Sequence, residues 1–422
     1  MALRTDTAAP TLDAEAVSAV SARLDEPDWL RELRAGWWRR AEAAPWPSGQ
    51  EEEWRRTSLD GLPRDAGLLV DAPRVEVELP AHLADAGVVF ADLRDAVRTH
   101  PQLVRRFLVA RDTRPPQEHF WALAHAAWTG GTFLYVPADV RVDQTLVARA
   151  AMPGGAAWFP LTVVVAEQGS DLALLEEVDS PDGEAAWYGG VVDLVAGPGA
   201  RVRYASLQRL GDATWNIGAK RVDVGQDAEV TTLDAQVGSL VTKVGLDVRM
   251  SGKGGTSRLL GLLAAGAKQH IDINSLQDLI ASHTTSDLLY VSALYDEARA
   301  AFYGVTRVER EAKGTSSYQE CRNLLLSPNA GAEPIPVLEI ETNDILRCGH
   351  GATAGAIDPV QRFYAQTRGL TPHEAERMIV RGFFEQVLSQ IPSETIRRRV
   401  LAALAPRIGV ADDDLLDGGV AA

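Results

Sequence analysis

The side chains best suited to chemistry in this sequence are those of Cys348 and His350, in the segment Cys348-Gly349-His350. Residues two apart on a β-strand point to the same face and lie about 6.6 Å apart along the backbone, so a thiolate and an imidazole could bind one metal ion. A closed tetrahedral site needs four ligands, and the sequence has no CxxC or HxxxH spacing. Two interpretations follow: a buried cysteine beside a hydrogen-bonded histidine, or a half-site completed by another part of the chain or by a partner.

His270 and Asp272 have the same spacing, and His283 follows thirteen residues later. Polar side chains on a solvated face are the simpler interpretation, and a metal triad is the alternative. Cys321 lies 27 residues before Cys348, so the two thiols would stack in adjacent repeats if the repeat length is 27. The glycine-rich segment 252–257 lacks the GxxxxGK[ST] spacing of a phosphate-binding loop, and we interpret it as a turn.

Short strands must position these residues, because a period-two alternation of apolar and polar residues begins near Thr132 and continues for roughly 220 residues. Glycine-containing turns recur about 27 to 29 residues apart, as at 168–171, 197–200, 225–228 and 252–255. This period predicts a β-solenoid of roughly eight coils. Propeller blades usually need 40 or more residues, and a left-handed hexapeptide solenoid needs an aliphatic residue at every sixth position, which is not found here.

Helical periodicity flanks the strands on both sides. Five of the ten tryptophans precede residue 55, and the pattern predicts two short helices within 13–44, a longer one over 90–108 and a short one over 120–128. Thr371-Pro372-His373-Glu374 supplies an N-cap, a proline at N1 and a glutamate at N3, so we expect a helix from there to Pro392 and another after Ser393. We therefore expect four parts: a helical domain 1–130, a β core 131–360, a helical domain 361–410 and a disordered tail 411–422.

The composition of the chain argues against nucleic-acid-binding and membrane-spanning functions. Of the 422 residues, 42 are Lys or Arg and 58 are Asp or Glu, which leaves a net charge of −16, and such a field repels nucleic acid. The longest apolar stretch, 259–267, has about nine residues and cannot span a bilayer, which takes about 18 or more. Two cysteines and a start without signal-peptide character fit the cytoplasm. We expect neither a nucleic-acid nor a membrane partner.

Ordered motifs across the chain resemble a known family. They are Glu53-Trp54-Arg55-Arg56-Thr57, 131–137, Gln269-His270-Ile271-Asp272, Phe302-Tyr303-Gly304, 321–327, Leu338-Glu339-Ile340, Cys348-Gly349-His350-Gly351-Ala352-Thr353, Phe363-Tyr364, Arg368-Gly369-Leu370 and Gly382-Phe383. Together they resemble the SufB/SufD family of iron–sulfur cluster assembly scaffold proteins. The SufD type fits better, because the Glu-His-Glu run near 349–351 and the reactive cysteine near Ala330 that mark SufB are absent.

The resemblance implies a mainly β protein, a right-handed parallel β-helix with N-terminal and C-terminal helical domains, that acts as a scaffold and not as an enzyme. It implies a heterodimer with SufB through the β-helices, or a homodimer in isolation, and docking of the ATPase SufC on the C-terminal helices, where we expect Phe383, Phe384, Val387 and Leu388 to contribute. It places His350, with Cys348, at the SufB interface. His270, Asp272 and Cys321 are secondary candidates.

By the same resemblance, the cargo is a nascent iron–sulfur cluster or iron, held transiently and shared with the partner, and the chain alone binds no cofactor tightly. Two alternatives from other classes stay open on the sequence. One is a secreted-type carbohydrate-active β-helix enzyme, such as a polysaccharide lyase, and the other is an oligomerisation module without metal chemistry.

Overall fold

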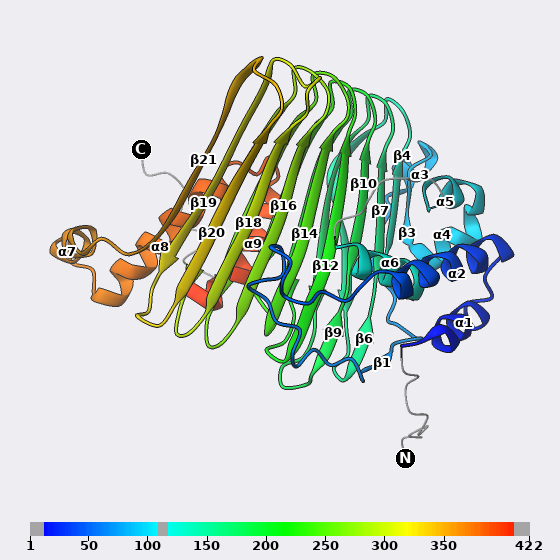
Figure 1. Cartoon of the computed structure of the whole chain (residues 1–422), viewed down its shortest axis with the longest axis horizontal. Helices are drawn as coiled ribbons and strands as arrows, with labels where there is room; N and C mark the ends of the chain where they lie inside the picture. The colour runs from blue at the N-terminus through cyan, green and yellow to red at the C-terminus, as the bar shows by residue number, and fades with distance from the viewer. Residues whose placement is uncertain (1–11, 109–116, 409–422) are drawn as a thin grey trace.

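A computed structural model describes residues 12–108 and 117–408 of the chain. Its centre is a rod of two sheets whose strands alternate along the chain, so that each coil contributes one strand to each sheet (Figure 1). The predicted parallel β-helix, preceded and followed along the chain by helices, is confirmed.

The first sheet has the order β20-β18-β16-β14-β12-β10-β7-β4-β3, with β1, β6 and β9 beside it. Its strands are β1 (Gly67–Leu68), β3 (Val89–Asp92), β4 (Thr132–Val136), β6 (Ala156–Trp158), β7 (Leu161–Ala166), β9 (Ala186–Tyr188), β10 (Val191–Ala196), β12 (Thr214–Val224), β14 (Val241–Met250), β16 (His270–Leu279), β18 (Arg299–Val308) and β20 (Gly331–Ile340).

The second sheet has the order β2-β5-β8-β11-β13-β15-β17-β19-β21. Its strands are β2 (Glu76–Val77), β5 (Arg141–Ala151), β8 (Asp171–Asp179), β11 (Arg201–Arg209), β13 (Glu229–Gln236), β15 (Thr256–Ala265), β17 (Thr285–Leu294), β19 (Thr315–Leu325) and β21 (Ile345–Ala356). All of these except β2 run parallel, so the described part of the chain makes about eight coils, as predicted.

The coils stay in register because one turn of each contains a residue in the left-handed backbone region, as at Gly199, Asp227, Gly254, His283 and Gly314. The amide of each such residue donates to a carbonyl in the equivalent turn of the next coil; for example, the amide of His283 donates to the carbonyl of Lys313 over 2.8 Å. Glycine adopts this conformation without a steric penalty, and Asp tolerates it better than most residues. The predicted glycine-rich turns thus align the strands, and His283 occupies one of these turns.

The N-terminal helices close one end of the rod. They are α1 (Ala14–Arg23), α2 (Asp28–Ala43), α3 (Ala81–Asp85), α4 (Leu93–Thr99), α5 (Pro101–Leu108) and α6 (Glu118–Ala127). Buried apolar side chains, Trp121 and Trp128 among them, join these helices to the first sheet. The helix predicted over 90–108 was wrong in extent: Phe90 lies in β3, Asp92 caps α4, and Pro101 begins α5.

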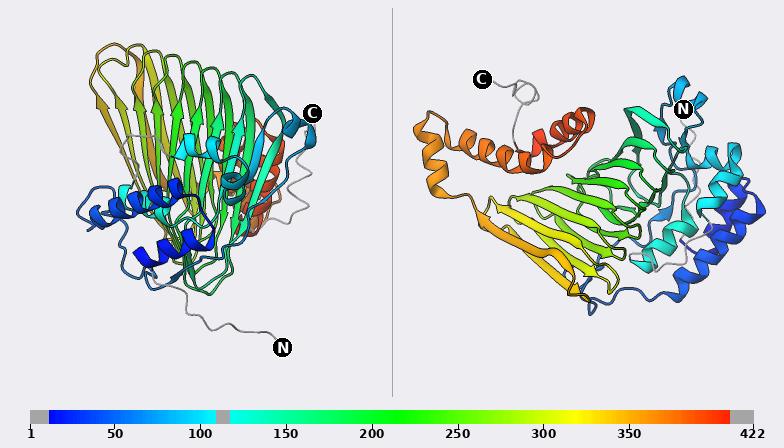
Figure 2. Two further views of the ribbon diagram at one scale, coloured as in Figure 1. Left: turned by 90° about the vertical axis from the view of Figure 1, so that its right-hand side faces the viewer. Right: turned by 90° about the horizontal axis from the view of Figure 1, so that it is seen from above.

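The C-terminal helices are α7 (Pro359–Thr367), α8 (Pro372–Leu388) and α9 (Glu394–Ile408). Thr371 and Glu374 form the predicted capping box. Helices α8 and α9 lie across the outer face of the second sheet, over β11, β15 and β17, whereas α7 projects beyond the rod (Figures 1 and 2). The predicted tail 411–422 lies outside the described residues.

The two ends of the rod differ. At the N-terminal end, the antiparallel strands β2 and β3 pair with β5 and β4. At the other end, the outer edges of β20 and β21 pair with no strand in the described part of the chain. We call this second end, formed by β20 and β21, the open end.

Candidate functional site

Cys348 and His350 lie on β21, the last strand of the rod, and face its lumen. Their partners in register are Ser317 and Gln319 on β19, and both of these side chains are buried in the lumen at 1% and 0% exposure. Residues in register on neighbouring strands share a face, so Cys348 and His350 stand on the same side, one layer above them. The predicted same-face arrangement of the thiol and the imidazole is therefore present.

The open end leaves this pair accessible. His350 is exposed, and Cys348 is half-buried against the lumen core. Partial burial raises the pKa of the Cys348 thiol, because a thiolate loses hydration there. Because the raised pKa favours the protonated thiol, metal binding at Cys348 would release a proton.

The two strands of the open end differ in the edges that they present. Strand β20 contains Pro334 and Pro336, which cannot donate backbone hydrogen bonds and are typical of edge strands that avoid pairing. Strand β21 has no proline over its twelve residues. A register shift between β19 and β21 leaves Leu346 78% exposed at its start. The β21 edge is thus the one better suited to accept a strand from another chain.

Cys321 does not stack with Cys348, which corrects the prediction from their spacing. Cys321 is in register with Tyr290 on β17 and with Ala352 on β21, 31 residues away on either side. The coils near the open end are therefore longer than 27 residues, and Cys348 lies four positions, or about 13 Å, along the strand from the partner of Cys321. Burial raises the pKa of Cys321 to about 12.

His270 and Asp272 belong to a cluster on the outer face of the first sheet that holds the N-terminal segment. The Asp272 carboxylate accepts from the Thr57 hydroxyl over 2.6 Å and from Lys243 Nζ over 2.7 Å. Since the Thr57 proton goes to Asp272, the Thr57 oxygen accepts from His270 Nε2–H at 2.9 Å. Lys243 also donates to the backbone carbonyl of Glu53. We call these five residues the latch.

The latch gives His270 and Asp272 structural partners. The Lys243 and Asp272 side chains are 0% and 2% exposed, so their charges compensate each other out of contact with water. Burial lowers the pKa of Lys243 and of His270. The hydrogen bonds of both candidate residues thus tie residues 53–57 to the rod, and His283 lies apart from them in its turn.

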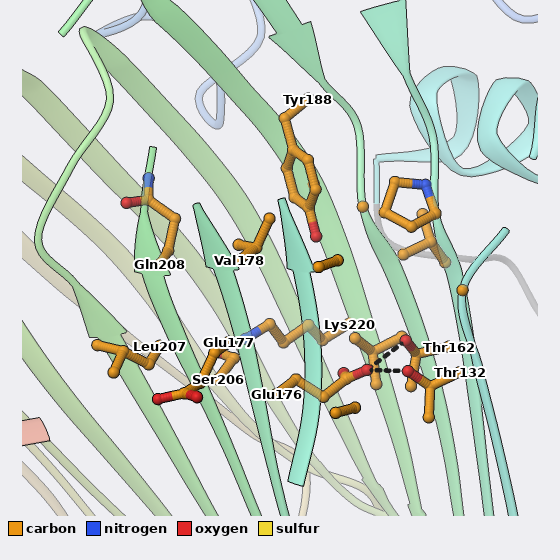
Figure 3. Close-up of a pocket in the computed structure, with 18 of the residues that line it drawn as sticks. Thr132, Thr162, Glu176, Glu177, Val178, Tyr188, Ser206, Leu207, Gln208 and Lys220 are labelled. Atoms are coloured by element: carbon orange, nitrogen blue, oxygen red, sulfur yellow. Dashed lines mark hydrogen bonds between the residues drawn. The ribbon is translucent and has the colours of Figure 1, made fainter. Parts of the chain in front are cut away.

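A buried polar cluster in the lumen was missed by the sequence reasoning. Glu176 accepts hydrogen bonds from Thr132 over 2.6 Å, from Thr162 over 2.8 Å and from Tyr204 over 2.7 Å. These side chains line a cavity of about 70 Å³ together with Tyr188 and Lys220. Figure 3 shows the hydrogen bonds from Thr132 and Thr162 to Glu176 in this cavity. The volume suits a few water molecules.

The polar cluster continues along the lumen toward the open end. Asp234 accepts from Ser206 over 2.8 Å, forms an ion pair with Lys220, and accepts from the Tyr290 hydroxyl over 2.9 Å. Burial is the first cause that raises the pKa of Tyr290, and the Asp234 charge is the second. The inward column runs from Glu176 through Ser206, Asp234, Gly261 and Tyr290 to Cys321. The sequence does hold a sign of this cluster: Glu176 and Asp234 are acidic residues at positions that the period-two alternation directs into the lumen.

The C-terminal helices bury most of the residues predicted to dock a partner. Phe384, Val387 and Leu388 are at most 1% exposed and pack on the outer face of the second sheet, while Phe383 is partly buried at the edge of that cluster. The exposed apolar side chains lie elsewhere on these helices. They are 51% to 71% exposed, and they are Val360, Phe363, Tyr364 and Met378.

A family model described as "SUF system FeS cluster assembly, SufBD core domain" matches residues 148–383, more than half of the chain. The chain belongs to the SufBD family. The matched part begins within β5 and ends within α8, so it contains most of the rod, the open end and the Cys348/His350 pair.

Individual relatives match over most of their length. The chain is 24% identical over 430 aligned positions to the iron–sulfur cluster assembly protein SufD of Bacillus subtilis, covering 94% of this chain and 98% of the relative. It is 28% identical to a SufBD family protein of Staphylococcus saprophyticus, over 74% of this chain and 67% of the relative. A SufBD family protein of Mycobacterium bovis is also 28% identical, over 87% of this chain and 90% of the relative.

Membership of the SufBD family associates the chain with iron–sulfur cluster assembly. It favours that function over the two alternatives, a carbohydrate-active enzyme and a module without metal chemistry. Among the described residues, no three His, Cys, Asp or Glu side chains converge on one metal position. In that same part of the chain, no helix has both the length and the apolar character needed to cross a bilayer. Cys348 and His350 are two side chains of kinds that ligate iron.

Proposed function

We propose that this chain is the SufD-type subunit of a SUF complex that assembles iron–sulfur clusters in the cytoplasm, acting as a scaffold and not as an enzyme. It pairs with a SufB-type subunit, docks the ATPase SufC, and contributes Cys348 and His350 to a site at which a nascent cluster or iron is held transiently. The observation that carries the proposal is the position of this pair on the final strand of the rod, at its open end.

Two protein ligands leave a tetrahedral iron site incomplete, and in this proposal the SufB-type subunit supplies further ligands. The free edge of β21 supports such an arrangement, because a strand added there by β-augmentation would lie directly beside Cys348 and His350. The exposed side chains of Ile340 and Leu346 would be buried by the same contact.

His350→Ala is the direct test. In the complex purified with its partners, anaerobic reconstitution with iron and sulfide should give at most about one tenth of the wild-type cluster, because loss even of an outer-shell partner of a metal ligand costs about 10-fold or more. Subunit stoichiometry should not change, because pairing by β-augmentation uses the backbone hydrogen bonds of β21, which the substitution leaves in place. The control is His82→Ala, an exposed histidine of the N-terminal part, and it should behave as wild type. Wild-type cluster content in His350→Ala would refute the proposed site.

For SufC docking we propose the surface formed by Val360, Phe363, Tyr364 and Met378, in place of the residues that the fold buries. This surface lies on α7, which projects beyond the rod, and on the adjoining α8 (Figure 2). Aromatic and methionine side chains are enriched at protein interfaces, and their exposure here leaves apolar area that a partner would remove from water.

Phe363→Ser combined with Tyr364→Ser should weaken SufC binding at least 10-fold without changing the melting temperature of the isolated chain, because both side chains are exposed. Titration of labelled SufC measures the affinity. Phe384→Ala is the contrasting variant: it should lower stability by about 3–5 kcal/mol, because Phe384 is 1% exposed in the core. Unchanged SufC affinity in the double variant would place docking elsewhere.

A further inference from the structure

The amide of Gln319 is an orphaned polar group directly beneath the open end. Gln319 is 0% exposed, and neither its Oε1 nor its Nε2 has a hydrogen-bond partner. Leaving a buried donor and acceptor unpaired destabilises a fold, and most buried polar groups are therefore bonded. The lumen can provide such bonds: Gln277, also 0% exposed, donates to the Ser286 hydroxyl over 2.9 Å and accepts from Thr306 over 3.1 Å.

The position of Gln319 relates it to His350. The two residues are in register on β19 and β21 and face the lumen together. The Gln319 side chain reaches toward the opposite sheet, where a Cβ at Gly304 would overlap its Nε2 atom, so Gly304 leaves the space that the amide occupies. Gly304 is itself in register with Ser275, whose buried hydroxyl is also unpartnered. The layer under the open end thus carries unpaired donors and acceptors.

We propose that Gln319 is a positioning residue for the cargo held at Cys348 and His350. The amide N–H donates to a sulfide or thiolate sulfur of the nascent cluster, and Oε1 accepts from the ring N–H of His350, which leaves the other imidazole nitrogen for iron. This inference rests on the proposed function. It accounts for both unpaired amide atoms: Nε2 acquires its acceptor with the cargo, and Oε1 acquires its donor when iron binding fixes the His350 ring.

A positioning role predicts opposite effects of an apolar substitution on the stability of the empty protein and on cluster retention, whereas a purely structural role does not. If the amide is unpaired in the empty chain, replacing it with an apolar side chain should stabilise the empty protein and weaken the loaded one. Hydrogen bonds to cluster sulfurs also raise the reduction potential, since they stabilise the more negative reduced state. Loss of the hydrogen bond from Gln319 should therefore lower the reduction potential of the cluster.

The experiment uses the complex with its partners, reconstituted anaerobically with iron and sulfide. Gln319→Leu should reduce retained cluster by about 10-fold and shift the potential of the remaining cluster to more negative values. The melting temperature of the empty chain should stay equal or rise by about 2 °C. Gln319→Glu keeps the side-chain shape and replaces the donor with an acceptor, so it should lose at least as much cluster.

Gln277→Leu is the matched control, because it makes the same substitution at a lumen glutamine whose bonds are satisfied. It should lower the melting temperature and leave the potential of the cluster unchanged. If Gln319→Leu behaves in this way too, Gln319 is only structural and the inference is overturned. His350→Ala is measured alongside: loss of cluster there with a wild-type result for both Gln319 variants would refute this inference alone, whereas wild-type cluster in His350→Ala would refute the proposed function.

Discussion

At the scale of single residues, the inward column in the lumen depends on a glycine, Gly261, at one of its positions. Gly261 lies between Asp234 and Tyr290 in register, and a Cβ at Gly261 would overlap the Tyr290 ring. The ring therefore lies over the glycine and brings its hydroxyl to within 2.9 Å of the Asp234 carboxylate. Glycine weakens a strand interior, but here it permits a buried hydrogen bond to a charged group.

Gly261→Ala should lower the free energy of unfolding by about 1–3 kcal/mol, because the added methyl group displaces the Tyr290 ring and breaks its bond to Asp234. Urea unfolding of the isolated chain measures the change. Gly355→Ala on β21 is the control, since a Cβ there meets nothing within 4 Å, and it should change stability by less than about 0.5 kcal/mol. Equal effects of the two substitutions would contradict this account of Gly261.

Residue-scale predictions from sequence succeeded where the relevant contacts are local. The alternation of side chains along a strand is enough to place Cys348 and His350 on one face. It cannot place Cys321 beside either of them, because register between coils depends on the length of the intervening turns. Nor could the roles of His270 and Asp272 be seen, since Thr57 reaches them from more than 200 positions away.

At the scale of elements, the first sheet carries an acid whose pKa is raised by burial. The pKa of Asp247 on β14 is raised to about 7, first by loss of hydration and second by the negative charge of Asp278 on β16. In the unfolded chain an aspartate ionises near pH 4. Between about pH 4 and pH 7 the folded chain therefore binds more protons at this site than the unfolded chain does.

Stability should consequently fall as the pH rises through this window. Asp247→Asn keeps the neutral form at all pH values, so its free energy of unfolding should exceed that of the wild type by up to about 4 kcal/mol at pH 8. The difference should shrink toward zero near pH 4. Urea unfolding at several pH values measures both proteins, and a difference that does not vary with pH would refute the argument.

Element-scale predictions from sequence were strongest at the helix α8, where four consecutive residues determine the capping box. The sequence predicted less well what the apolar face of that helix packs against. An apolar stripe shows that one side is buried, but whether it packs on its own rod or on a partner depends on the distant strands β15 and β17. Phe384, Val387 and Leu388 are therefore buried apolar residues, but they contact the rod of their own chain.

At the scale of the whole molecule, the rod is closed at one end and open at the other. Exposed strand edges and apolar side chains favour pairing with another chain, and the open end combines both with the candidate ligands. Without the proposed SufB-type partner, we expect this end to pair with a second copy of itself across a two-fold axis.

We therefore expect the isolated chain to form dimers at micromolar concentration, and Leu346→Glu to shift it toward monomer by at least 10-fold in dissociation constant, because the added charge would be buried in the contact. Sedimentation equilibrium measures both. Met378→Glu, at an exposed apolar position on α8, is the control and should dimerise as the wild type does. A wild-type chain that stays monomeric at high concentration would contradict this assignment of the open end.

The latch also constrains the timing of synthesis. Thr57 bonds to Asp272, 215 residues further along the chain, so the N-terminal segment cannot be fastened until that part of the rod has left the ribosome. At about 5–20 residues per second this delay is about 10–40 s. Throughout that interval the N-terminal segment of the nascent chain is unattached, and the strand edges of its incomplete coils are exposed to pairing with other chains.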